Sequence, residues 1–276
     1  ECFGYTNLKL EITTNTGSIL ESRNDGGQGF MGNDNKKVLG VLGGMGPLAT
    51  QLFYRMVIEK TDANCDQEHL DMIILSHATM PDRTKEILEG RTEELFQLLL
   101  KDAQMLESNG AGVIAIPCNT SHVLVDRLQE NIRIPIINMV EETVKHIADT
   151  SHANDLRVGI LATDGTINMD LYQKALERAG ITPVIPSKES QKLVMKLIYD
   201  GIKNGGEIDF SDFLTIQKEI FEQGCQAAIL ACTELSCFKE MYHLPPYYID
   251  AMGMLTEKSI LACGGEIKGT GVSNDG

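Results

Sequence analysis

The stretch Gly112-Val-Ile-Ala-Ile-Pro-Cys118-Asn119-Thr120-Ser121-His122 joins an apolar run to a cysteine and three small polar residues. The segment that follows, 123–130, has the mixed apolar and charged composition of an amphipathic helix. This order predicts a buried parallel strand that ends near Pro117 and delivers Cys118 to a helix N-terminus. Free backbone N–H groups and the positive end of the helix dipole would favour a thiolate there over a thiol.

A second copy of this pattern lies 114 residues further on (232 − 118), where Gln226-Ala-Ala-Ile-Leu-Ala leads into Cys232-Thr233-Glu234-Leu235. The turn at Gly43 precedes the first cysteine by 75 residues (118 − 43). The turn at Thr163 precedes the second by 69 residues (232 − 163). Similar spacing between matching elements indicates an internal duplication of an α/β unit.

Apolar runs and helical periodicity predict the elements around the two cysteines. Strands are expected at 38–42, 71–77, 112–116, 134–139, 157–162, 183–185 and 226–231. Helices are expected at 49–60, 84–89, 92–109, 141–149, 169–179, 189–203, 210–223 and 249–263. The predicted fold is therefore α/β, with two pseudo-symmetric lobes, each a short parallel sheet flanked by helices, and an active site in the cleft between them.

The expected domain organisation follows from these elements. Lobe 1 comprises 36–135 plus 245–265, because Pro245-Pro246 would mark a crossing back, and lobe 2 comprises 136–244. Residues 1–35 are rich in Asn, Thr, Gly and Ser, and their apolar residues are scattered. We expect this segment to be a poorly ordered N-terminal extension.

Composition excludes several classes of protein. Of the 276 residues, 24 are Lys or Arg and 39 are Asp or Glu, so the net charge is −15, which argues against a nucleic-acid or anionic-membrane partner. No apolar run approaches the ~18 residues needed to span a bilayer. The seven cysteines form no CxxC pair, which is typical of reduced thiols and predicts a cytoplasmic location.

Three further motifs fall where strands are expected to end. The first is Gly43-Gly-Met45-Gly46-Pro47. It has neither the G-x-G-x-x-G pattern nor a P-loop lysine, so a turn that binds a small anion is favoured over a loop that binds the phosphates of a nucleotide. The others are the loop at Asp82-Arg83 and the turn at Thr163. Since ligands bind at the carboxyl ends of parallel strands, these motifs and both cysteines should meet in one cleft.

Two cysteines on opposite sides of a cleft suit one chemistry, the removal of a proton from one face of a carbon and its return to the other. One sulfur must act as a thiolate base while its partner remains a protonated acid. The histidines His69, His77 and His122 lack the spacing of a metal site, so no metal is expected.

The chain resembles the aspartate/glutamate racemase superfamily, and within it the aspartate racemase branch. The resemblance covers about residues 38–263 and rests on motifs in the family's order. These are Gly43–Thr50, Asp66-Gln67-x-His69, Pro81-Asp-Arg83-Thr84, Pro117-Cys-Asn-Thr-Ser-His122 and Ala231-Cys-Thr-Glu-Leu235. It implies an isomerase that racemises an acidic amino acid, aspartate ahead of glutamate, without pyridoxal phosphate or another cofactor. It also implies a homodimer.

The resemblance also implies roles for particular residues. Cys118 and Cys232 would form the acid/base pair. The α-carboxylate would be held by Asn119, Thr120 and Thr233, with help from Met45 and Gln51. Arg83 would bind the distal carboxylate, Lys203 would supply a second cation, and Thr163 would line the substrate.

Two other functions fit the same motifs. A relative could use one cysteine for decarboxylation or cis–trans isomerisation of a dicarboxylate, although the retention of both cysteines disfavours this. A carboxylate-binding protein without turnover would leave the matched cysteines unexplained. The motifs do not decide between aspartate and glutamate, because the two differ by one methylene group. For Glu234, a helix-capping role is the expectation.

Overall fold

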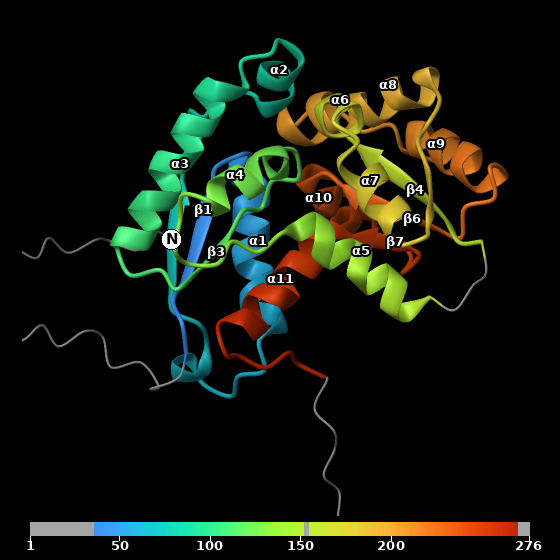
Figure 1. Cartoon of the computed structure of the whole chain (residues 1–276). Helices are drawn as coiled ribbons and strands as arrows, with labels where there is room; N and C mark the ends of the chain where they lie inside the picture. Colours follow the sequence, from blue (N-terminus) through green and yellow to red (C-terminus); the bar gives the residue numbers. More distant parts are fainter. Residues whose placement is uncertain (1–35, 152–154, 270–276) are drawn as a thin grey trace, which may run out of the picture. The chain divides into compact units, whose positions relative to one another are not determined.

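The computed structural model describes residues 36–151 and 155–269, so the predicted N-terminal extension, 1–35, lies outside the described residues. These two ranges are the first half, 36–151, and the second half, 155–269, of the described chain. Each half contains one sheet, and every strand pair in both sheets is parallel (Figure 1). Among the described helices, none combines the length and the apolar character needed to cross a bilayer.

The first sheet contains β1 (Leu39–Gly43), β2 (Met72–Ser76) and β3 (Val113–Ala115), in the order β2-β1-β3. Every residue of β1 and β3 is buried. Continuous apolar runs of this kind, without alternation, are typical of strands that are covered on both faces.

The second sheet contains β4 (Arg157–Ala162), β5 (Thr182–Val184), β6 (Ala227–Ala231) and β7 (Tyr248–Asp250), in the order β5-β4-β6-β7. In each half, the first strand lies between the second and the third. The shared order β2-β1-β3 and β5-β4-β6 is what a duplicated unit would produce.

Most of the helices match predicted segments, but no helix range was predicted at Asp164–Asn168 or Thr233–Tyr242. Those of the first half are α1 (Pro47–Lys60), α2 (Arg83–Leu88), α3 (Thr92–Ser108), α4 (Val125–Gln129) and α5 (Met139–Thr150), with short 3₁₀ turns at Asp66–Glu68 and Thr120–Leu124. Those of the second half are α6 (Asp164–Asn168), α7 (Leu171–Arg178), α8 (Lys188–Lys196), α9 (Phe210–Glu222), α10 (Thr233–Tyr242) and α11 (Ala251–Ala262). The predicted helix 189–203 changes at Leu197 from α-helix to a π-helix, Leu197–Lys203.

Two hydrophobic clusters hold these layers together. In one, the buried face of α3, with Leu95, Leu99 and Leu106, packs on Leu42 and Ile114 of the first sheet. The other cluster joins the opposite side of the first sheet to the whole of the second sheet and its helices. The two sheets therefore share a core.

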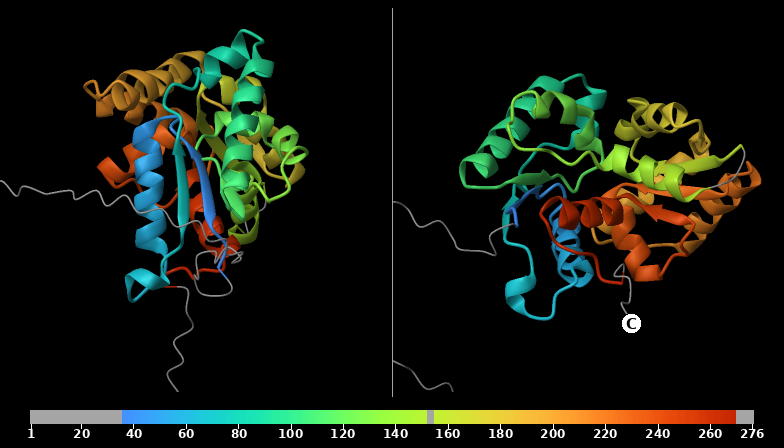
Figure 2. Two further views of the ribbon diagram at one scale, coloured as in Figure 1. Left: turned by 90° about the vertical axis from the view of Figure 1, so that its left-hand side faces the viewer. Right: turned by 60° about the horizontal axis from the view of Figure 1, so that its bottom comes forward.

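The last helix of each half packs against the other half. Helix α5 contacts α7 of the second half, whereas α11 contacts α1 and β3 of the first half. Figure 2 shows α11, in red, beside α1, in blue, and close to α5, in green. The final helix therefore packs on the first half as well as on its own.

One predicted strand is wrong, and one observed strand was not predicted. Segment 134–139 forms only an isolated bridge, in which the Ile114 N–H donates to Pro135 O and the Ile137 N–H donates to Ile114 O, both at 2.9 Å. Proline cannot donate, so the ladder does not extend through Pro135. Strand β7, which lies within the range 245–265 placed in lobe 1, instead pairs with β6 in the second sheet. The lobe boundaries themselves stay a prediction.

Candidate active site

Cys118 and Cys232 reach one cavity from equivalent strand ends. Cys232 follows β6 directly and is the N-cap of α10, as predicted. Cys118 lies three residues beyond β3 and precedes a 3₁₀ turn, so its predicted α-helix begins only at Val125. Each cysteine is 5% exposed. The cavity between them measures about 10 Å³, room for about one water molecule, so it must open to admit an amino acid.

The cavity collects the predicted site residues from both halves, with one exception. It is lined by Met45, Asp82, Arg83, Thr84, Cys118, Asn119, Thr120, Thr163, Tyr199, Lys203, Cys232, Thr233 and Glu234. Gln51, predicted to help hold the α-carboxylate, lies exposed on α1 and does not line the cavity. Within the described ranges, no group of three His, Cys, Asp or Glu side chains is placed to hold a metal ion.

Charged groups of opposite sign lie beside the two sulfurs. The Cys232 thiol donates to Glu234 Oε2 at 2.9 Å. Burial raises the pKa of Cys232 well above its usual range, and the negative charge of Glu234 raises it further, although Lys203 and the Glu234 backbone N–H lower it. Cys232 is therefore held as a protonated thiol.

Arg83 lies on the other side, next to Cys118. Burial lowers the pKa of Arg83, but the negative charges of Cys118, Asp82 and Glu234 outweigh it and the net shift is upward. Arg83 and Cys118 line the same cavity, so a cation is part of the surroundings of Cys118. The two cysteines therefore have unequal surroundings.

The Arg83 guanidinium is fixed by backbone carbonyls and keeps one donor free. Its Nη1 donates to Pro81 O at 2.8 Å and to Met80 O at 3.3 Å, and its Nη2 donates to Met45 O at 3.1 Å. Its buried Nε–H has no partner among the described residues, and the residue is 7% exposed. A buried donor without a partner costs free energy, which a bound carboxylate would recover.

The Gly-rich turn helps to hold Arg83, because the Met45 carbonyl in this turn accepts a hydrogen bond from the guanidinium. Met45 is 2% exposed and also lines the cavity. The turn itself is closed by Thr50, whose Oγ1 accepts from the Gly44 N–H at 2.8 Å and donates to Gly46 O at 3.0 Å. Gly44 has φ +90°, and a Cβ there would lie 2.4 Å from His77 N. This packing requires glycine.

Asn119 presents a second free donor. The Tyr172 hydroxyl donates to Asn119 Oδ1 at 2.5 Å, and both side chains are buried. In the described part of the chain, no acceptor meets Asn119 Nδ2. Tyr172 therefore orients the amide so that its N–H₂ group remains available to a ligand.

Replacing Tyr172 with Phe should test this orientation. We expect KM to rise about tenfold while kcat changes less, because the Asn119 amide loses the hydrogen bond that fixes it. Tyr248→Phe is a matched control, since Tyr248 is 1% exposed and its hydroxyl has no partner in the described residues. Steady-state kinetics of both variants measure the effect; equal KM values in the two variants would remove Tyr172 from this role.

Three threonines join the halves behind the cysteines. Thr120 Oγ1 lies 3.1 Å from the Oγ1 atoms of Thr163 and Thr166, which are 3.2 Å from each other. His122 is buried below them, with Nδ1 2.9 Å from Cys118 O. Burial lowers the pKa of His122, so it is neutral and supports the Cys118 backbone.

Lys203 is already paired. Its Nζ lies 3.8 Å from Asp82 Oδ2, 3.7 Å from Glu234 Oε1 and 4.6 Å from the centre of the Tyr199 ring. Burial lowers the pKa of Lys203, but Glu234, Cys232 and Tyr199 raise it, and the net shift is upward. Lys203 is therefore a cation shared between the carboxylates from the two halves.

Four residues of the cavity were not predicted as site residues. Asp82 and Thr84 flank Arg83 inside a quoted motif, and Glu234 follows Cys232 within another. Tyr199 lies four residues before Lys203, one helical turn away, and its hydroxyl donates to Asp82 at 3.1 Å. The spacing of Tyr199 and Lys203 could have identified the pair.

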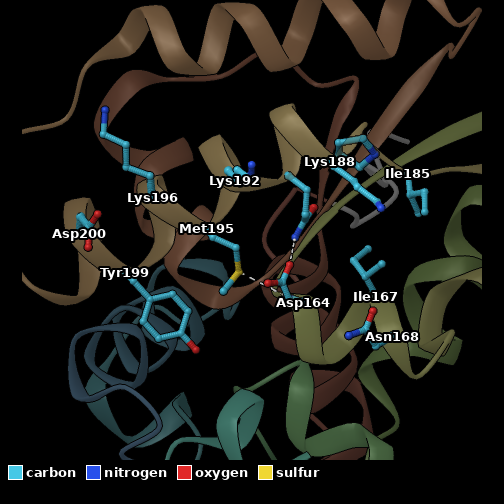
Figure 3. Close-up of a pocket in the computed structure, with 12 residues that line it drawn as sticks. Asp164, Ile167, Asn168, Ile185, Lys188, Lys192, Met195, Lys196, Tyr199 and Asp200 are labelled. Carbon is cyan, nitrogen blue, oxygen red and sulfur yellow. Dashed lines mark hydrogen bonds between the residues drawn. The ribbon is translucent and has the colours of Figure 1, made fainter. Parts of the chain in front are cut away.

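Tyr199 also separates this cavity from a larger one, of about 750 Å³, in the second half. Figure 3 shows Met195 and Asp164 at its centre, with Lys188, Lys192 and Lys196 around them. Neither cysteine lines it. The chemistry therefore belongs to the smaller cavity.

Comparison with known proteins agrees with this geometry. A family model described as Asp/Glu/Hydantoin racemase matches residues 42–258. The broad specificity amino-acid racemase RacX of Bacillus subtilis (strain 168) is 30% identical over 229 residues, which cover 81% of this chain and 96% of that protein.

Solved structures show the same fold. The aspartate racemase of Picrophilus torridus superposes with a TM-score of 0.70 at 27% identity, over 84% of this chain and 96% of that one. A glutamate racemase of Francisella tularensis, solved with D-glutamate, has a TM-score of 0.61 at 20% identity, over 82% and 79%. The predicted α/β fold, with two parallel sheets flanked by helices, is confirmed.

Proposed function

The chain belongs to the Asp/Glu/hydantoin racemase family, as its motifs predicted, and we propose that it racemises an acidic amino acid by two-cysteine proton transfer. Aspartate is the proposed substrate, with glutamate as the alternative, and no cofactor is required. The observation that carries this proposal is the pairing of Cys118 and Cys232 in one cavity. The cavity also contains two buried donors, Arg83 Nε and Asn119 Nδ2, that have no partner among the described residues.

The proposed reaction has two proton transfers. The Cys118 thiolate removes the α-proton, and the carbanion then takes a proton from the Cys232 thiol on its opposite face. The surroundings of Cys232 support this assignment for the resting enzyme, since burial and the Glu234 carboxylate raise the pKa of Cys232 and hold it protonated. The opposite enantiomer reacts with the two roles reversed.

Buried donors supply the proposed recognition of substrate. Asn119, Thr120 and Thr233 would hold the α-carboxylate, with Met45 and Thr163 as walls. The free edge of Arg83 would bind the distal carboxylate, with Lys203 as the second cation. Gln51 is not proposed to touch substrate in this closed form, because its side chain lies outside the cavity.

The alternatives make different demands on the cavity. A decarboxylase or dicarboxylate isomerase would need one thiol, and a binding protein would need neither. Cys232 bonds to Glu234, whereas Cys118 shares the cavity with Arg83. Two thiols with different surroundings favour proton transfer at both faces of the α-carbon. A homodimer and a cytoplasmic location remain expectations.

One experiment tests the function and its substrate together. The reduced protein is incubated in D₂O with L-Asp, L-Glu, L-Ala or L-Lys, followed by chiral chromatography and mass spectrometry. We expect D-Asp carrying deuterium at Cα, with less product from the neutral and basic amino acids. Absence of Cα exchange with every amino acid would reject racemisation, and equal rates with L-Ala or L-Lys would reject the acidic specificity.

A further inference from the structure

Glu234 makes the closest polar contact to a reacting sulfur. Its Oε2 accepts from the Cys232 thiol at 2.9 Å and from Thr233 Oγ1 at 3.4 Å, and its Oε1 lies 3.7 Å from Lys203 Nζ. The residue is 4% exposed. Its carboxylate therefore contacts a sulfur, a hydroxyl and an ammonium group, and the helix-capping role expected from the sequence does not describe these contacts.

Glu234 also lies between two cavities. It lines the catalytic cavity and a second cavity of about 410 Å³ on the far side. Exposed residues, among them Pro47, Leu48 and Asn204, rim the second cavity, so it opens to solvent. Arg83 and Lys203 line both cavities as well, but neither cysteine lines the second one. Of the groups shared by the two cavities, Glu234 alone is a carboxylate.

Net conversion of one enantiomer creates a need for proton exchange. Each turnover from the resting form leaves a proton on Cys118 and an ionised Cys232. Before the same enantiomer can react again, Cys232 must regain a proton and Cys118 must lose one. Because both sulfurs are 5% exposed, exchange with bulk water is restricted.

From these contacts we infer that Glu234 carries protons between Cys232 and the solvent in the second cavity, an inference that rests on the proposed racemisation. The Glu234 carboxylate takes a proton from water or buffer in the second cavity, so that an O–H bond forms on Glu234. It then gives this proton to the Cys232 thiolate, so that the O–H bond breaks, an S–H bond forms and the carboxylate is restored. The proton on Cys118 leaves to water in the catalytic cavity that both sulfurs line.

Lys203 lies between Glu234 and a second carboxylate, Asp82, which has no part in the relay. Lys203 lies 3.7 Å from Glu234 and 3.8 Å from Asp82, so it stabilises both carboxylates. Asp82 has no contact with Cys232 among the described hydrogen bonds and ion pairs. The two acids therefore share a lysine but differ in access to the sulfur, which makes them a matched pair for mutation.

The experiment compares two rates in Glu234→Gln. Net conversion of pure, saturating L-substrate requires Cys232 to be reprotonated. Transfer of isotope label between L- and D-substrate at equilibrium does not require this step. The D-enantiomer reacts with the protonation state that the L-enantiomer leaves, and its reaction restores the starting state. We expect the ratio of net conversion to label transfer to fall at least about tenfold, since Gln accepts the thiol bond but cannot carry a proton.

Two further variants serve as controls. In Asp82→Asn, the ratio should stay at the wild-type value, because the acid that contacts Cys232 is retained. In Glu234→Asp, it should stay well above that of the Gln variant, because a carboxyl group remains. Circular dichroism checks the fold of each protein.

Each outcome is decisive. An unchanged ratio in Glu234→Gln would mean that water between the sulfurs resets the enzyme, and the relay would be wrong. If net conversion and label transfer fell equally, Glu234 would support the fold or the proton transfers at Cα, and would not be a proton relay to solvent. That result would also overturn the inference. Absence of label transfer in the wild-type protein would instead reject the proposed racemisation.

Discussion

Changing Cys118 or Cys232 to Ser should lower the racemisation rate by at least about 10³-fold, the upper range for loss of a positioned acid or base. Serine keeps the size of the side chain but its hydroxyl is a far weaker acid than a thiol. The two variants should retain the fold, since both sulfurs lie at the cavity wall. Chiral chromatography of product from each enantiomer measures the loss.

Cys237→Ser provides the matched control for this pair. Cys237 lies on α10, five residues after Cys232, and is 4% exposed, but it does not line the cavity. It should keep racemisation within a few fold of wild type. Full activity in either Cys118→Ser or Cys232→Ser would exclude that residue as acid or base.

Arg83→Lys should produce the second large effect. Lysine retains the positive charge beside Cys118, but it cannot reproduce the guanidinium edge that leaves Nε free inside the cavity. We expect kcat/KM for aspartate to fall about 100-fold, equivalent to about 2.7 kcal/mol, while the rate with a neutral amino acid falls much less. Steady-state kinetics with L-Asp and L-Ala measure the difference.

Arg91→Lys controls for a general effect of the substitution. Arg91 lies three residues after α2 (91 − 88), pairs with the buried Glu86 and the exposed Glu89, and does not line the catalytic cavity. Its variant should behave as wild type with both substrates. An Arg83→Lys variant that kept its preference for aspartate over alanine would assign the distal carboxylate to another residue.

Much of this site could be predicted because the order of residues along the chain is enough to show which side chains follow a strand. A cysteine that follows an apolar run will lie at the carboxyl end of a strand, and parallel strands bring such ends together. Cys118, Asn119, Cys232 and Thr233 meet in one cavity for this reason. Arg83, from the Pro81–Thr84 motif, and Lys203 line the same cavity.

Side-chain direction explains what the sequence missed. Gln51 lies six residues after Met45 in the sequence (51 − 45), but its side chain is exposed on α1. Tyr172 is far from either motif, and only the packing of α7 brings its hydroxyl to Asn119. The contact from Glu234 to the sulfur depends on a rotamer, which motif spacing does not determine.

The exchange of α5 and α11 across the shared core makes each half dependent on the other. Each half packs its final helix on its neighbour, a contact of the kind that joins subunits in a domain-swapped dimer. A half-length chain that paired with a second copy of itself would bring one thiol from each copy to a shared cavity, and both thiols would have the same surroundings. In a single chain the two surroundings can differ, as the bond from Cys232 to Glu234 shows.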